Sequence, residues 1–227
     1  MPKPNPITYF DSEGNENLSE VLKVIKRTVQ KRPELQGCKV IFLTAEGHGP
    51  ALAYNMLEQF GQKIIAVTFS PFFCLQRQGK QFHPQISSRV RKFFQGVEIP
   101  ILTSRLPFES FGGSQSSISS TLKLVNDAFA VFGGSVPLAI QAVLQACDMG
   151  HVQVGEVAIV ATGDCALLVS ASSSAMFLSV ERGLCVLEIL CKPRRFDISR
   201  PKPPQPQTIE ASPDVGASEN KAKLELP

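Results

Sequence analysis

Short runs of consecutive apolar, β-branched residues constrain the fold of this chain more than any other feature. Three of them are Val40–Thr44, Ile64–Thr68 and Glu156–Ala161, and turn residues bound each one. Continuous apolar runs of this length indicate strands that are buried on both faces of a sheet. Amphipathic segments with helical spacing lie before and between these runs, at about Leu18–Lys31 and Pro50–Phe60. This alternation predicts an α/β fold with a mostly parallel sheet and helices on both of its faces.

Weaker patterns complete the set of elements. The last apolar run, Leu184–Cys191, alternates between apolar and polar residues, which is typical of a strand at the edge of a sheet. Two connections, 69–84 and 104–116, lack periodicity, and long loops in compact domains are usually functional or disordered. The other predicted elements are strands at Val97–Thr103 and Ala166–Ser170, a helix at about Gln85–Gln95, and two consecutive helices on either side of Gly133-Gly134.

Composition divides the chain into three parts. Residues 1–16 are predicted to be an extended lead-in, and residues 17–192 carry all the elements named above. Residues 193–227 are rich in proline and poor in large apolar side chains. Such a segment cannot bury enough surface to offset the entropy lost on ordering, so we expect a disordered tail.

Charge and cysteine content exclude several classes of protein. The net charge is +3 and no long basic block is present, which argues against a nucleic-acid partner. No apolar run approaches the roughly 18 residues of a membrane span, so no membrane partner is expected. The six cysteines form no C-x-x-C pair, and no spacing of potential ligands is typical of a metal site. Thiols in apolar surroundings and the lack of a signal-peptide pattern predict a cytoplasmic protein.

The turn that follows the first buried strand is the first candidate site. In open α/β sheets, ligands bind at the carboxyl ends of the strands, and anions bind at helix N-termini. The predicted ligand cradle consists of Thr44, Glu46, Gly47, His48 and Gly49. Thr44 would donate its hydroxyl, and the two glycines would let the backbone approach a ligand. In the alternative interpretation this is an ordinary turn in which Glu46 stabilises the helix dipole. A further hypothesis makes His48 a general base.

Other candidate residues follow the neighbouring strands. Ligand contacts at the strand ends are predicted for Thr68, Ser70, Thr103, Gly163 and Asp164. Cys165, with Asp164 beside it and a histidine elsewhere, suggests a nucleophile. The alternative is a β-turn whose Asp and Gly are chosen for their backbone preferences.

The connection 69–84 carries both cationic and aromatic residues. Arg77, Lys80 and His83 would be able to clamp an anion, and Phe72 and Phe73 to stack on a flat ring. The alternative is a solvated loop with two aromatic side chains packed into the core.

A series of short motifs occurs in a fixed order along the chain. They are Tyr9-Phe10, Gly14, Asn17, Thr44-x-x-Gly47, Val67-Thr68, Leu102-Thr103, Phe132-Gly133, Asp148-x-Gly150 and Ile189-Leu-Cys-Lys-Pro-Arg194. From Tyr9 to Arg194 the chain resembles stand-alone proteins that are similar to the C-terminal α/β domain of pyruvate kinase. The resemblance implies a three-layer α/β/α sandwich with a mostly parallel five-stranded sheet. It also implies a small ligand, with flavin mononucleotide as one candidate cofactor, and a homo-oligomer.

The chain departs from this family at its phosphate cradle. Relatives resemble Thr-x-Ser/Thr-Gly-x-Ser/Thr there, whereas Glu46 and Gly49 take the two other hydroxyl positions of this chain. A carboxylate repels a phosphate in the absence of a metal. The chain also has no room for the catalytic barrel of roughly 200 residues or more, so it is not a pyruvate kinase.

Three hypotheses for the function follow. In the first, a non-catalytic or regulatory domain binds a small phosphorylated or nucleotide-like ligand at the carboxyl ends of the strands. In the second, a small enzyme uses Glu46, His48 or Cys165 in an unknown reaction. In the third, a ligand-free oligomeric scaffold recruits a partner through its tail or an apolar surface.

Overall fold

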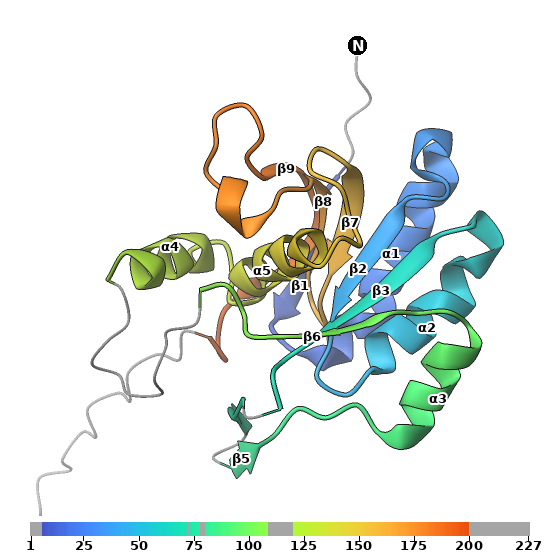
Figure 1. Ribbon diagram of the computed structural model, residues 1–227, viewed down its shortest axis with the longest axis horizontal. Coiled ribbons are helices and arrows are strands. Elements are labelled where there is room, and N and C mark those ends of the chain that lie inside the picture. The colour runs from blue at the N-terminus through green and yellow to red at the C-terminus, as the bar shows by residue number, and fades with distance from the viewer. Residues whose placement is uncertain (1–5, 72, 78–79, 109–119, 200–227) are drawn as a thin grey trace, which may run out of the picture.

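The computed structural model describes residues 6–71, 73–77, 80–108 and 120–199. A seven-stranded sheet lies between two layers of helices (Figure 1). Its strands are β1 (Thr8–Ser12), β2 (Lys39–Leu43), β3 (Lys63–Thr68), β6 (Ile101–Thr103), β7 (Val157–Ala161), β8 (Ala166–Ser170) and β9 (Cys185–Arg195). A separate hairpin consists of β4 (Leu75–Arg77) and β5 (Lys80–Phe82). The helices are α1 (Leu18–Lys31), α2 (His48–Leu57), α3 (Ser88–Gly96), α4 (Ser120–Ala130) and α5 (Ser135–Asp148).

The central strands are buried on both faces because their alternate residues enter two separate cores. In β2, Val40 and Phe42 pack with α1, α2 and α3, whereas Ile41 and Leu43 pack with α5. Residues of β3 and β7 divide between the same two cores. This two-sided burial accounts for the continuous apolar runs in the sequence. The α/β/α sandwich with a mostly parallel sheet is confirmed.

The strand order is β1-β9-β8-β7-β2-β3-β6. β2 pairs in parallel with β3 and β7, and β3 with β6, so the carboxyl ends of these four strands lie at one edge of the sheet. β8 runs antiparallel to both of its neighbours, because a short turn connects it directly to β7. Among the described residues, no helix is long and apolar enough to cross a membrane.

The structure corrects the predicted number of strands and two boundaries. The sheet has seven strands rather than the five that the resemblance implies: they are the six strands predicted from the sequence and β1, which lies within the predicted lead-in and pairs with β9. β9 is therefore an interior strand rather than an edge strand, and its polar residue Glu188 makes a two-pronged ion pair with Arg32. The predicted tail boundary at residue 193 is also wrong, since Pro193 and Arg195 pair with β1. Composition missed this boundary because backbone pairing does not depend on apolar side chains. Residues 200–227 of the predicted tail lie outside the described part.

Close packing of the β2–α2 connection depends on Gly49. A Cβ atom there would lie 2.2 Å from a ring carbon of Phe42, which is itself buried in the core. We predict that Gly49→Ala lowers the free energy of unfolding by about 1–3 kcal/mol, because overpacking forces the ring or the backbone to shift. Urea denaturation of the full chain measures the effect.

Gly96→Ala is the matched control. Gly96 ends α3, and a Cβ atom there would meet nothing within 4 Å. We expect this variant to be as stable as the parent or more stable by up to about 1 kcal/mol. Equal losses of stability in the two variants would contradict the assignment of Gly49 to close packing.

Candidate functional site

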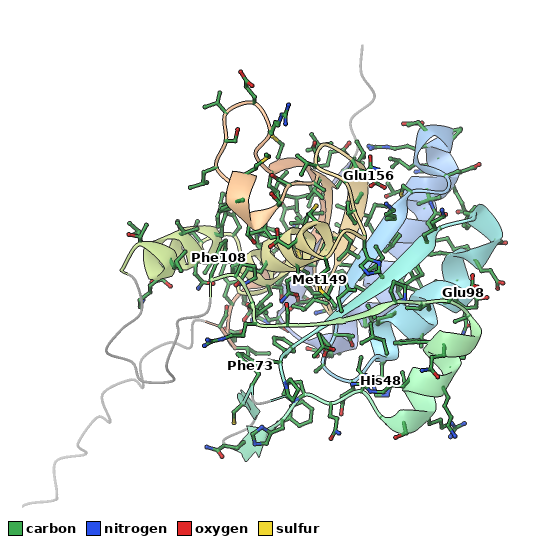
Figure 2. All side chains as sticks on the ribbon, in the orientation of Figure 1. His48, Phe73, Glu98, Phe108, Met149 and Glu156 are labelled. Atoms are coloured by element: carbon green, nitrogen blue, oxygen red, sulfur yellow. The ribbon has the colours of Figure 1, made fainter. Side chains whose placement is uncertain are left out.

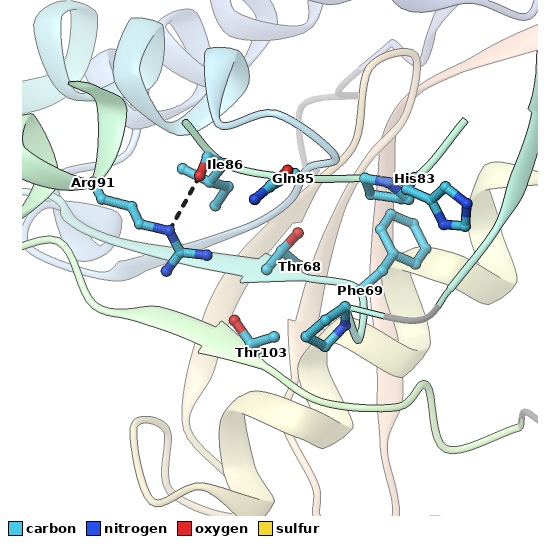
Figure 3. Close-up of a pocket in the computed structure, with 9 residues that line it drawn as sticks. Thr68, Phe69, His83, Gln85, Ile86, Arg91 and Thr103 are labelled. Carbon is cyan, nitrogen blue, oxygen red and sulfur yellow. Dashed lines mark hydrogen bonds between the residues drawn. The ribbon is translucent and has the colours of Figure 1, made fainter. Parts of the chain in front are cut away.

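A small pocket lies at the carboxyl ends of β3 and β6 (Figure 3). Its volume is about 200 Å³. In Figure 3, Arg91, Thr68 and Thr103 lie toward one end of the pocket, and Phe69 and His83 lie toward the other. The polar part of the lining consists of Thr68, Gln85, Arg91 and Thr103. The other lining residues are Phe69, Pro71, His83, Pro84 and Ile86.

The two threonines meet because β3 and β6 pair in parallel with Thr68 opposite Thr103. Residues opposite each other on neighbouring strands project from the same face of a sheet. Thr68 continues the row of Ile64 and Ala66, whose side chains pack with the α1–α3 layer. The row thus changes from apolar to hydroxyl-bearing at the last residue of the strand, and both hydroxyl groups come to lie beside α3.

The hydroxyl of Thr68 is buried without a partner. The residue is 3% exposed, and Oγ1 has no hydrogen bond within the described residues. Leaving a buried hydroxyl group unpaired costs about 1–3 kcal/mol. Such a group in a native structure calls for an explanation, and a polar ligand in the adjoining pocket is one.

Arg91 supplies the positive charge of the pocket. It lies in the first turns of α3, where the side chain of Ser87 caps the helix by accepting from the N–H of Val90. Nε of Arg91 donates to the carbonyl of Ile86 at 3.1 Å, which holds the guanidinium in place. In Figure 3 the guanidinium is on the side of the pocket near Thr68 and Thr103. Within the described residues, its two terminal nitrogens make no hydrogen bond or ion pair, so the fork remains available to an anion.

The charge of α3 as a whole favours an anion. The helix contains Arg89, Arg91 and Lys92 and no acidic residue. The nine residues that line the pocket likewise include no aspartate or glutamate. Like-signed charges along one wall raise the local concentration of ligands of opposite charge.

Aromatic residues secure the other end of the pocket. Phe69 stacks on Phe73 with ring centroids 4.7 Å apart. Nδ1 of His83 lies 3.2 Å from the carbonyl oxygen of Phe73. Phe73 was predicted as a stacking partner for a flat ligand, and its ring stacks on Phe69 instead. Phe72 lies outside the described residues.

The Thr44–Gly49 turn lies at the same edge of the sheet, but the protein itself fills the space around its glycines. Gly47 has a φ of 89°, and a Cβ atom there would lie 2.7 Å from Val90 of α3. The Thr44 hydroxyl accepts from the N–H of Gly47 at 2.9 Å. Packing thus accounts for Gly47, as it does for Gly49, without a ligand. Ligand binding by this turn stays a prediction.

Glu46 and His48 lie at the surface of the turn. The Glu46 carboxylate and Nδ1 of His48 are 3.8 Å apart; the His48 side chain is largely exposed and that of Glu46 is half-buried. His48 and Phe73 lie at the carboxyl end of the sheet, and Glu156 at the opposite end (Figure 2). No contact joins His48 to Cys165 among the described residues.

Gly163 and Asp164 hold two segments of the chain together. Asp164 is 4% exposed and accepts from the N–H of Gly14 at 3.0 Å and from the Thr162 hydroxyl at 3.3 Å. A Cβ atom on Gly163 would lie 2.1 Å from Oδ1 of Asn15. Burial raises the pKa of the Asp164 carboxyl group, although the hydrogen bonds to it act in the opposite direction. The turn therefore joins β7 and β8 to the segment that follows β1.

The other predicted residues are distributed differently. Ser70 does not line the pocket, and its carbonyl accepts from the N–H of Phe73 at 3.0 Å. Arg77 and Lys80 pair with each other across the β4–β5 hairpin, and their side chains lie outside the described part. Of the predicted residues, the structure brings Thr68, Thr103 and His83 to one pocket. Sequence reasoning missed Arg91 and Gln85. The signal for Arg91 was a helix with three cations and no acid, and Gln85 had none.

Cys165 lies in the core rather than at the site. The residue is 0% exposed, and burial raises the pKa of its thiol well above the usual value. A thiol in this environment is a poor nucleophile, because the reactive species is the thiolate. The nucleophile hypothesis therefore loses support.

Alkylation tests the burial of Cys165. We predict that iodoacetamide modifies the exposed Cys185 in the native protein and leaves Cys165 and Cys191 unmodified. Peptide mass spectrometry of native and urea-unfolded samples measures this, and the unfolded sample serves as the control for reactivity. Rapid modification of Cys165 in the native state would reopen the nucleophile hypothesis.

Asp164 makes a pH-dependent contribution to stability. Because its pKa is raised on folding, the contribution is fully present below the usual value of 3.8 and is lost as the pH rises through the raised value. We predict that the parent loses stability relative to Asp164→Asn, which keeps an acceptor for Gly14, as the pH rises from acid to neutral. Denaturation curves at several pH values measure it, and a constant difference would contradict it.

The chain matches no protein-family model. Among the described residues, no group of three or more histidine, cysteine, aspartate or glutamate side chains could hold a metal ion.

Proposed function

We propose that this protein is a non-catalytic binding domain that holds a small phosphorylated ligand at the carboxyl ends of β3 and β6. The observation that carries the proposal is the buried, unpaired hydroxyl of Thr68 beside the fork of Arg91. The resemblance to the C-terminal domain of pyruvate kinase supports the same class of function.

Each polar residue has a distinct part in this proposal. The terminal nitrogens of Arg91 would donate to two phosphate oxygens, a geometry that gives both strength and orientation. Thr68 and Thr103 would donate beside the fork, and Arg89 and Lys92 would add positive potential without direct contact. A ligand that binds in this way satisfies the Thr68 hydroxyl, which the folded chain alone does not.

The lining favours binding over catalysis. It contains neither a carboxylate nor a thiol, so His83 is the one side chain there suited to general acid–base chemistry. A regulatory domain that senses a phosphorylated metabolite needs no such group.

Location and assembly belong to the same proposal. No disulfide joins any of the six cysteines, all of which lie in the described part of the chain, and this supports the reducing conditions of a cytoplasm. The exposed apolar side chains of Leu178, Val180 and Leu187 support a homo-oligomer. Sedimentation velocity of the full chain tests assembly, and a strict monomer would contradict it.

The substitution Thr68→Val is expected to change phosphate affinity and the stability of the fold in opposite directions. This substitution keeps the shape of the side chain and removes the unpaired hydroxyl. We predict that the free energy of unfolding rises by about 1 kcal/mol while the affinity for inorganic phosphate falls about three- to tenfold. Urea denaturation and calorimetric titration of the full chain measure the two effects.

Arg91→Gln and Arg89→Gln form the matched pair for the same titration. Both remove one positive charge from α3, but only Arg91 lines the pocket. We expect Arg91→Gln to weaken phosphate binding at least about tenfold, since a hydrogen bond to a charged group is lost, and Arg89→Gln to weaken it about twofold. No binding to the parent chain, or equal losses in the two variants, would refute the proposed function.

A further inference from the structure

The proposed function leaves open what the phosphate is attached to, and the two ends of the pocket bear on this question. Arg91, Thr68 and Thr103 lie at the polar end, and Phe69 and His83 lie at the other (Figure 3). Pro71 and Pro84, which are near these two residues in the sequence, add apolar surface to the lining. A ligand that satisfies both ends carries an anionic group and an apolar body.

The number of donors favours a phosphate over a carboxylate. The terminal nitrogens of Arg91 form a fork that occupies both oxygens of a carboxylate. The hydroxyls of Thr68 and Thr103 add two more donors beside that fork. A phosphomonoester offers three terminal oxygens, so it can accept from the fork and from both threonines together.

The acceptors of the pocket argue against a ribose or ribityl group. Carboxylate side chains are a common means of recognising ribose hydroxyls in α/β folds. The lining has no such residue, and its side-chain acceptors are the threonine hydroxyls, Gln85 and His83. Sugar hydroxyls next to Phe69 and Pro71 would lose hydrogen bonds to water without replacement.

The size of the pocket also argues against a nucleotide as the ligand. The pocket of about 200 Å³ is smaller than the roughly 300–1,000 Å³ of typical cofactor sites. The stack with Phe73 holds the ring of Phe69 in place, so that end does not widen by rotation of a free side chain. A nucleoside or flavin is therefore too large to follow its phosphate into the pocket.

We infer that the ligand is the phosphomonoester of a compact apolar alcohol, with its phosphate between Arg91, Thr68 and Thr103 and its organic group against Phe69 and Pro71. This inference rests on the proposed function. It replaces a nucleotide-like ligand by a smaller and less polar one.

Calorimetric titration of the full chain tests the ligand class with five phosphates and with one carboxylate, benzoate. The phosphates are the first set. They are inorganic phosphate, phenyl phosphate, glycerol 3-phosphate, adenosine monophosphate and flavin mononucleotide. We expect phenyl phosphate to bind about tenfold more tightly than inorganic phosphate, because its ring buries apolar surface. Glycerol 3-phosphate and the two nucleotides should bind no more tightly than inorganic phosphate. Benzoate, which has the ring but a carboxylate, should bind at least about tenfold more weakly than phenyl phosphate.

A variant at the apolar end ties the preference to the pocket. Pro71 is exposed, so Pro71→Ser leaves the core unchanged. We expect it to reduce the preference for phenyl phosphate about threefold and to leave the affinity for inorganic phosphate unchanged. Arg91→Gln should lower the affinities for phenyl phosphate and for inorganic phosphate by the same factor.

The outcomes separate the inference from the function on which it rests. Tighter binding of either nucleotide than of phenyl phosphate, or equal affinity for phenyl and inorganic phosphate, would overturn the ligand class and leave a phosphate site. An unchanged preference in Pro71→Ser would overturn it as well. Failure of every phosphate to bind would refute the proposed function itself.

Discussion

Burial of the central strands on both faces is the constraint on which the rest of this structure depends. Every side chain of β2 from Val40 to Leu43 enters one of the two cores, so little of the strand is left for polar chemistry. On the central strands, polar side chains are confined to the strand ends, where the helical layers no longer cover them. The hydroxyl groups of Thr68 and Thr103 occur at such positions because each is the last residue of its strand.

The carboxyl edge of the sheet has two halves. Polar side chains are hydrogen-bonded within the protein in one half and unpaired in the other. On the side of β7, the chain satisfies its own carboxylates: Asp164 accepts from Gly14, and Glu13 accepts from the N–H groups of Gly134 and Ser199. On the side of β3 and β6, a hydroxyl is unpaired and a guanidinium fork is unused within the described residues. Groups that are already paired gain little from a ligand, whereas unpaired groups gain a full hydrogen bond. This difference is why we propose the second half as the binding site.

The sequence predicted the layers of the fold because two-sided burial leaves a direct trace in the apolar runs. It also predicted Thr68 and Thr103, since a strand end can be located from such a run. It could not predict Arg91, because that contact depends on where α3 lies against the ends of two strands. The role of Gly47 was equally hidden: a glycine that admits a ligand and one that admits Val90 look alike in a sequence. The sequence did not predict the pairing of β1 with β9, because this pairing rests on backbone hydrogen bonds between segments far apart in the chain.

The position of α3 joins the two candidate sites physically. Val90 packs on Gly47 of the turn, and Arg91, the next residue, lines the pocket. An anion that draws the guanidinium toward Thr68 and Thr103 acts on the same helical turn that covers Gly47. The free energy gained by pairing a buried hydroxyl and a charged fork is a few kcal/mol, a substantial fraction of the roughly 5–15 kcal/mol that stabilises a typical domain. Binding of the proposed anion would therefore stabilise the α3 side of the molecule in particular, which is the response that the proposed ligand-sensing role requires.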